Sequence, residues 1–198
     1  MKTLSPIATL LLLFTTYNSF SQDISITDFL QLRATSTNTV ESKLNSFNIE
    51  LYDSENIGNG KTHYTYQNAD ALSAFQWVDF ISTPDAHWDN RLSFQIQNIE
   101  LVKKYLTEMK GLGFYFTGKK VVDRQIYEMY TDGFNMIELI TSQSKKGYDN
   151  NMYFNFAFYN AVEYQYAFAD ENKKYGVPEI NQTNLFAELI GVPVDSKK

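Results

Sequence analysis

The sequence predicts an α+β fold, in which an antiparallel sheet of about six or seven strands carries two main helices packed on one face. Two segments repeat apolar residues at helical spacing, and each is followed by three runs in which apolar and polar residues alternate. The chain is also rich in aromatic side chains, with 14 Tyr and 15 Phe, and it has only 4 Pro. Aromatic residues in alternating runs are typical of half-buried strands, so the sheet is expected to dominate the fold.

A short amphipathic helix is expected first, over residues 26–32. The first main helix follows it, because apolar residues then recur at spacings of four, three and four. Asn38 followed by Glu41 resembles a capping box at the start of this helix. The apolar stripe of the helix consists of Val40, Leu44, Phe47 and Leu51.

The second main helix is predicted from apolar residues at spacings of three, four and three. Asn98 can cap its start, and Gly111 or Gly113 can end it. Its apolar stripe consists of Ile99, Val102, Leu106 and Met109.

Strands are predicted after each helix. Asp132-Gly133 is a tight-turn signal between two of them. Residues 162–168 also alternate, which places Tyr164, Tyr166 and Phe168 on one face. The other predicted strands cover residues 61–67, 74–81, 91–97, 120–130, 134–141 and 153–158.

The two series of elements match at an offset of roughly 62 residues. Val40 falls on Val102 and Leu44 on Leu106, so the two leucines are expected to be equally buried. We interpret the match as two tandem α-β-β-β repeats. The alternative is that any two units with this element order would align equally well by pattern. The expected units are 22–98 with the short N-terminal helix, 99–170, and a C-terminal tail with a short helix over 171–198.

A helix followed by a three-stranded antiparallel meander, used in tandem, resembles the exported β-lactamase-inhibitor-protein-like folds. The single unit is similar to the small outer-membrane assembly lipoproteins of the SmpA/OmlA type. The resemblance covers element order only, and the lipoprotein cysteine is absent from this chain. It implies a binding or scaffolding role rather than catalysis.

The first 21 residues have the layout of a secretory signal peptide. Lys2 gives a positive start, an apolar run centred on residues 10–14 follows, and the small residues Ser19 and Ser21 precede Gln22. The apolar run is shorter than the roughly 20 residues that span a bilayer, and no transmembrane segment is expected in the mature chain. We therefore expect cleavage near Ser21/Gln22 and a periplasmic or secreted protein.

The composition excludes several classes of function. The net charge of −6 disfavours binding to nucleic acid or to anionic lipid. The absence of cysteine excludes disulfides, thiol nucleophiles and thiolate metal sites. Lysines occur as isolated pairs such as Lys119-Lys120, a pattern typical of solvated surface.

One motif resembles a phosphate-binding loop and is rejected. Residues 113–120 place glycines and a lysine at nearly the right spacing, but Lys120 stands where Ser or Thr would reach magnesium. A phosphate-binding loop also follows a strand and opens a helix, whereas this segment has the reverse order.

A second cluster could bind a divalent metal. Alternate residues of an extended segment point the same way, so two carboxylates and an imidazole could converge. A polar hairpin loop is the simpler interpretation, because a metal site needs three or four converging ligands with supporting partners. We therefore expect no metal and no cofactor. The cluster consists of Asp85, His87 and Asp89, with His63 as a further nitrogen donor.

Alternating tyrosines have two interpretations. They could pack in the core with their hydroxyls at the sheet margin, or they could form an exposed aromatic face for a protein or a sugar ring. The candidate binding surface comprises Tyr64, Tyr66, Trp88, Tyr164 and Tyr166.

These patterns favour an exported, non-enzymatic interaction module of a bacterial envelope. Its expected partner is another envelope or secreted protein, or a glycan. The alternative is a small hydrolase or metal-dependent enzyme centred on Asp85, His87 and Asp89. No catalytic residue can be named, since the chain has no Gly-x-Ser-x-Gly elbow.

Overall fold

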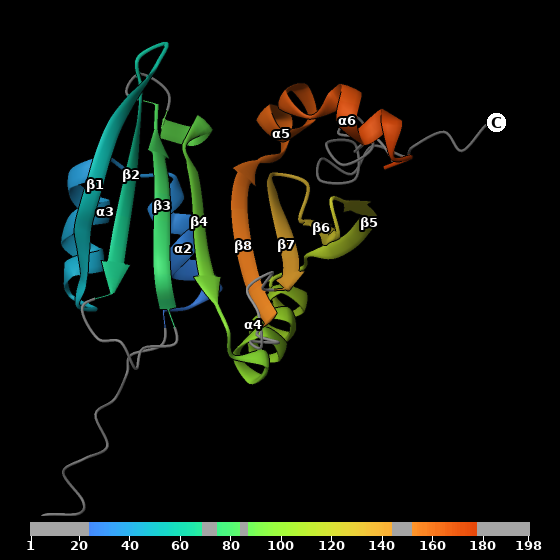
Figure 1. The fold of residues 1–198 in the computed structure, drawn as a ribbon, viewed down its shortest axis with the longest axis horizontal. Coiled ribbons are helices and arrows are strands. Elements are labelled where there is room, and N and C mark those ends of the chain that lie inside the picture. The colour runs from blue at the N-terminus through green and yellow to red at the C-terminus, as the bar shows by residue number, and fades with distance from the viewer. Residues whose placement is uncertain (1–23, 69–74, 84–86, 144–151, 178–198) are drawn as a thin grey trace, which may run out of the picture.

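The computed structural model describes residues 24–68, 75–83, 87–143 and 152–177. Its centre is an eight-stranded sheet with the order β1-β2-β3-β4-β8-β7-β6-β5 (Figure 1). Every neighbouring pair of strands is antiparallel. The predicted α+β class with an antiparallel sheet is therefore confirmed.

In both halves of the described chain, helical structure is followed by a meander of four strands. The first half consists of α2 (Ile26–Arg33), α3 (Thr37–Asn45), β1 (Ile49–Gly58), β2 (Lys61–Asn68), β3 (Phe75–Ser82), the short 3-10 helix η1 (His87–Asp89) and β4 (Arg91–Ile96). The second half consists of α4 (Ile99–Gly111), β5 (Tyr115–Val122), β6 (Gln125–Thr131), β7 (Asn135–Gln143), β8 (Met152–Asn160), α5 (Ala161–Ala167) and α6 (Ala169–Lys174).

The sequence pattern does not predict β1 or β5 as separate strands. Strand β1 is exposed at every position after Ile49, so it lacks the alternation that identifies a half-buried strand. The predicted single strand over 120–130 is a hairpin of β5 and β6. Its turn is made by Asp123 and Arg124, whose φ angles are +48° and +70°. Positive φ at both central residues suits a two-residue hairpin turn, and neither residue is the glycine or asparagine that usually indicates one.

The first main helix is shorter than its predicted stripe. It begins after Ser36 and ends at Asn45, so the expected cap at Asn38 is wrong. The chain then turns at Asn48, whose φ is +60°, and Leu51 lies exposed in β1 instead of on the helix. The short helix α2 covers the predicted segment and extends it by one residue, to Arg33.

The second main helix begins and ends as predicted. The Asn98 side chain accepts hydrogen bonds from the backbone N–H groups of Glu100 and Leu101, and α4 ends at Gly111. The buried face differs, because Ile99 is exposed and Leu106 is only half-buried. The expected equality of Leu44 and Leu106 is therefore wrong. The buried residues of α4 are Leu101, Val102, Tyr105 and Met109.

The predicted strand over 162–168 is wrong, since these residues form α5 and its C-cap. The Asn160 side chain accepts hydrogen bonds from the N–H groups of Val162 and Glu163, which is the standard N-cap arrangement. The cap starts a helix in spite of the period-2 pattern. Tyr164 and Tyr166 consequently point in different directions, one into the protein and the other into solvent.

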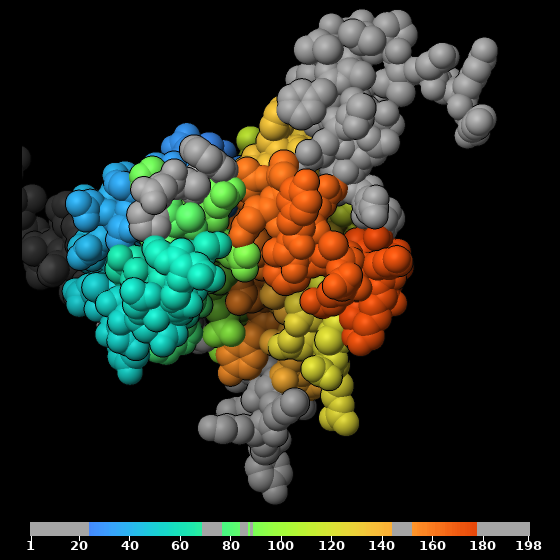
Figure 2. Space-filling view, turned by 90° about the horizontal axis from the view of Figure 1, so that it is seen from above, coloured from blue at the N-terminus to red at the C-terminus, as the bar shows by residue number. Residues whose placement is uncertain are grey.

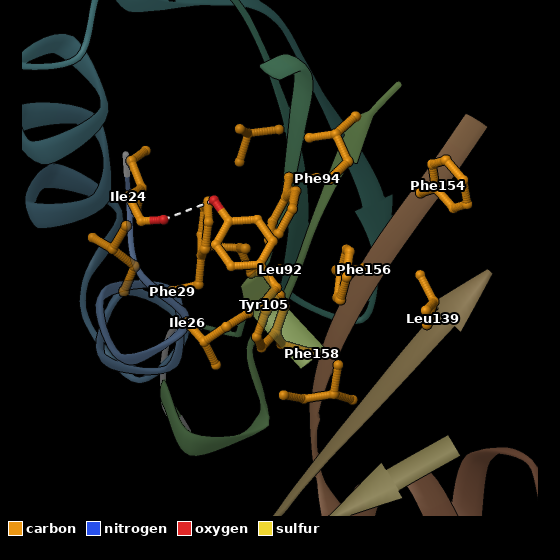
Figure 3. Packing of buried hydrophobic residues seen from close by; sticks show 14 of the residues in the cluster. Ile24, Ile26, Phe29, Leu92, Phe94, Tyr105, Leu139, Phe154, Phe156 and Phe158 are labelled. Atoms are coloured by element: carbon orange, nitrogen blue, oxygen red, sulfur yellow. Dashed lines mark hydrogen bonds between the residues drawn. The ribbon is translucent and has the colours of Figure 1, made fainter. Parts of the chain in front are cut away.

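The core lies where the two halves meet, along the pairing of β4 with β8 (Figure 3). Phe94 of β4 stacks on Phe29 of α2 with ring centroids 4.1 Å apart, and on Phe156 of β8 at 5.2 Å. Tyr105 of α4 contacts both strand rings edge-on and donates its hydroxyl to the Ile24 carbonyl at 2.8 Å. Helices α2 and α4 are thus anchored over the same strand junction.

The register of this junction is symmetric about the pair Phe94–Phe156. Leu92 pairs with Phe158, and Ile96 pairs with Phe154. If each residue of β4 is replaced by the residue 62 positions later, and each residue of β8 by the residue 62 positions earlier, the same three pairs result. Each half nevertheless has four strands where the sequence predicts three, and the tandem duplication stays a prediction.

The capping box at the start of α2 gives a measurable contribution to stability. Ser25 Oγ accepts from the Asp28 N–H at 3.0 Å, and the Asp28 carboxylate accepts from the Ser25 N–H at 3.2 Å. Ser25→Ala is expected to lower the free energy of unfolding by about 1 kcal/mol in urea titration. Ser36→Ala is the matched control, because Ser36 caps α3 without a side-chain bond to the helix backbone. Equal losses for the two variants would contradict this account.

Candidate functional site

The two faces of the sheet differ over β1–β4. Helices α2, α3 and α4 cover one face and enclose strand residues such as Tyr66, Phe80 and Phe94. On the other face, helices α5 and α6 pack against the second half, where Tyr164 meets Met129 and Met136. Figure 2, seen from above, shows the α5–α6 segment, in orange, in the right-hand part of the molecule, beside the cyan β1 and β2 and not in front of them. Over β1–β4 this second face is less covered than the first: α2, α3 and α4 lie on the opposite face, and Glu163 of α5 reaches Arg91 of β4 and Lys61 of β2 at one end of the strands. We call it the open face.

Side chains of the open face follow from strand alternation and register. Residues one position away from the buried ones point to this side. Most are polar, and the acidic ones outnumber the basic ones. The open face comprises Glu50, Tyr52, Asp53, Glu55, Lys61, His63, Thr65, Gln67, Trp77, Asp79, Ile81, Arg91, Ser93 and Gln95.

Two aromatic rings meet on this otherwise polar surface. Tyr52 is 67% exposed, and its ring lies edge-on to Trp77 with centroids 5.5 Å apart. The strand pairing skips one residue between Leu51 and Asp53, which places Tyr52 in a β-bulge. A bulge turns the extra residue out of simple alternation, and this irregularity brings Tyr52 to the same side as Trp77.

A hydrogen-bonded group lies beside the rings. The Asp79 carboxylate accepts from the Thr65 hydroxyl at 3.0 Å and lies 3.1 Å from His63 Nε2. The other ring nitrogen of His63 is 3.6 Å from Glu55. These contacts connect β1, β2 and β3 and orient the side chains of His63, Thr65 and Asp79.

The structure does not bring the predicted tyrosine surface together. Tyr66 is 0% exposed and Tyr164 is 1% exposed, so their assignment to an exposed binding face is wrong. Tyr64 is half-buried and packs against the core on the helix-covered face. Tyr166 is 84% exposed, on α5. Trp88 belongs to η1, and its side chain lies outside the described residues.

Only some residues of the predicted metal-binding cluster lie in the described part of the chain. Asp85 lies outside the described residues, while His87 is exposed and Asp89 is half-buried in η1. Among the residues that the structure describes, no three His, Asp or Glu side chains form a group that could hold a metal ion. His63 contacts Asp79 and Glu55 on the open face instead.

A buried charge cluster under α5 and α6 was not indicated by any sequence pattern. The ammonium of Lys120, whose side chain is 2% exposed, lies 3.3 Å from Glu138 and 3.1 Å from Glu171. Tyr164 donates to Glu138 at 2.6 Å. Lys120 is therefore not solvated surface, as its pairing with Lys119 suggests. The cluster ties α5 and α6 to the sheet, and its groups already contact one another.

Three buried tyrosines are expected to make the free energy of unfolding depend on pH in the alkaline range. Burial raises the pKa of Tyr66, Tyr159 and Tyr164 above the ordinary value of 10.0, and for the last two the neighbouring Glu138 carboxylate raises it further. A phenol with a raised folded-state pKa stabilises the fold fully below the unfolded pKa, and this contribution declines as the pH rises above it. The free energy of unfolding is therefore expected to fall between about pH 10 and 11 in urea titrations. Tyr164→Phe should decline less steeply, and an equal slope in the variant would contradict the assignment.

Comparisons with known proteins identify no relative: no family model, no curated protein and no solved structure matches this chain. The resemblance in element order to exported tandem folds thus stays a prediction. Among the described residues, no helix has both the length and the apolar character needed to span a bilayer.

Proposed function

We propose that the mature chain is an exported, non-enzymatic binding module whose contact surface is the open face of β1–β4. The observation that carries the proposal is the contact of the exposed Tyr52 ring with the half-buried Trp77 ring, among polar side chains. Aromatic rings beside polar groups are favoured at recognition surfaces, since they supply contact area at a low cost in side-chain entropy.

The charge of the open face limits its partners. Its acidic residues are Glu50, Asp53, Glu55 and Asp79. Its cations, Arg91 and Lys61, both contact Glu163 of α5, at 3.0 Å and 3.9 Å. A phosphate backbone or an anionic lipid would be repelled by such a surface. A neutral or basic partner in the bacterial envelope or the medium fits better.

The predicted signal peptide gives the proposal its compartment. Residues 1–21 lie outside the described residues, and export is proposed from their sequence pattern. The first described helix, α2, begins shortly after the expected cleavage point. Mass spectrometry of protein recovered from the periplasm or medium should find a mature chain that starts within a residue or two of Gln22.

The binding surface can be tested by comparing two exposed tyrosines. The mature chain and its Tyr52→Ala and Tyr166→Ala variants are immobilised and incubated with envelope extract and culture medium of the source cells. Bound protein and carbohydrate are then quantified. The proposal expects a component that the wild type and Tyr166→Ala retain and Tyr52→Ala loses. Retention of every bound component by Tyr52→Ala would contradict it.

A further inference from the structure

We propose that the open face contains a site for a neutral sugar, centred on Tyr52 and Trp77. This inference rests on the proposed function, because it assigns a ligand class to the same surface. The sugar ring would lie against the two aromatic side chains, with its hydroxyl groups directed to the amides and the carboxylate beside them.

The aromatic pair is suited to a pyranose ring. A sugar ring has a face of C–H groups, which packs on an aromatic surface in the way that other apolar groups do. Trp77 is half-buried, while Tyr52 stands edge-on to it and is largely exposed. Together they form the two sides of a corner that can receive the C–H face.

The strand pairing places polar side chains next to the Trp77 ring. Trp77 pairs with Gln67 of β2 on one side and with Gln95 of β4 on the other, and Gln67 in turn pairs with Glu50 of β1. Directly opposed residues on one face lie about 5 Å apart at Cβ. The indole thus lies between two amides, each of which can both donate to and accept from a hydroxyl group. The hydroxyl groups at the edge of a sugar ring need such hydrogen-bond donors and acceptors.

A shallow open depression adjoins Tyr52 and Gln67 on the β1–β2 side of the Trp77 ring. Its volume is about 290 Å³ and it is lined by Glu50, Leu51, Tyr52, Gln67 and Asn68. Ligand pockets usually begin at about 300 Å³, so the depression suits one or two sugar units better than a folded peptide segment. Its polar lining also distinguishes it from the apolar grooves that receive amphipathic helices.

Charge decides between neutral and acidic sugars. Asp53 and Glu55 lie on the same strand as Glu50, and β1 has no lysine or arginine. A uronic or sialic acid would bring a carboxylate next to these groups, which is unfavourable. The site is therefore assigned to neutral oligosaccharides.

Tryptophan fluorescence can test the site. The chain has 2 Trp, so a mature chain with Trp88→Phe reports on Trp77. The probes are cellohexaose, maltohexaose, xylohexaose and mannohexaose, with hexagalacturonic acid as the acidic comparison. At least one neutral hexasaccharide is expected to give a saturable change in emission. Hexagalacturonic acid should give none at the same concentration.

Variants locate the binding. Calorimetry with the active probe should show at least a tenfold loss of affinity for Tyr52→Ala and for Gln67→Ala, and no loss for Tyr166→Ala. Tyr52 and Tyr166 are both largely exposed, so neither substitution is expected to change the melting temperature. Unchanged affinity in Tyr52→Ala would overturn the inference.

The sugar assignment can fail separately from the proposed function. If no neutral hexasaccharide binds, the sugar site is rejected. The proposed binding module survives that result only if Tyr52→Ala loses a bound component in the pull-down. If Tyr52→Ala also retains every component there, both proposals are rejected.

Discussion

Phe94→Ala is expected to lower the free energy of unfolding by about 3–5 kcal/mol, the range for a buried phenylalanine. Phe94 is 1% exposed, and its ring contacts Phe29, Phe156, Phe158 and Tyr105. Removal of the ring leaves a cavity bounded by strands of both halves and by two helices. These rings are held by several neighbours, so they cannot collapse into the space.

Urea titration and calorimetry of the mature chain would measure the loss. For a chain of this size the melting temperature should fall by roughly 10 °C. Phe116→Ala is the control, because Phe116 lies on the edge strand β5, is half exposed and has its ring against that of Tyr130. Its loss should stay below about 1 kcal/mol. Similar losses for Phe94→Ala and Phe116→Ala would show that the strand junction is not the main core.

The second large effect is expected at the buried charge cluster. Lys120→Met leaves the Glu138 carboxylate buried without its cation, with the Tyr164 hydroxyl as its close donor. Breaking a buried ion pair by removing one partner costs about 3–5 kcal/mol, because the remaining charge is uncompensated. The α5–α6 segment should loosen in the same variant, since Lys120 also contacts Glu171 of α6.

A double-mutant cycle separates the pair from its surroundings. Lys120→Met with Glu138→Leu should be less destabilised than the sum of the two single variants, because no buried charge remains without its partner and the Glu171 carboxylate is partly exposed to solvent. Lys119→Met is the matched control: its side chain is half exposed and reaches Glu128 only at 4.0 Å, so its loss should be near zero. Additivity in the cycle would exclude coupling between Lys120 and Glu138.

Some local signals predicted local structure, and others did not. Asn98 caps α4 as its residue type and position indicate, and the glycine that ends this helix is also visible in the sequence. The hairpin turn at Asp123 and Arg124 could not be predicted in this way, since both residues adopt a positive φ without the usual sequence signal. Asn160 is of the same helix-capping residue type as Asn98. The apolar and polar residues after Asn160 alternate, however, and this pattern predicts a strand instead of the helix that Asn160 starts.

The candidate site depends on facts that no local pattern contains. Alternation places Tyr64 and Tyr66 on the same face of β2, but only the packing of helices decides which face is covered. Tyr52 reaches the open face through a bulge, and no residue type indicates that bulge. The partners of buried Lys120 are Glu138 of β7, two strands away in the sheet, and Glu171 of α6. Contacts of this long range decide which polar and aromatic residues remain available to a partner.

The strand junction between β4 and β8 also has a consequence for the order of folding. All other strand pairs join neighbours along the chain, whereas the partners in this pair lie roughly 60 residues apart in sequence. Closing so long a loop costs more chain entropy than closing a hairpin, and the cost is recovered only when the phenylalanine cluster packs. We therefore expect the meanders to form early and the rate of folding to be set by the encounter of two partly ordered halves.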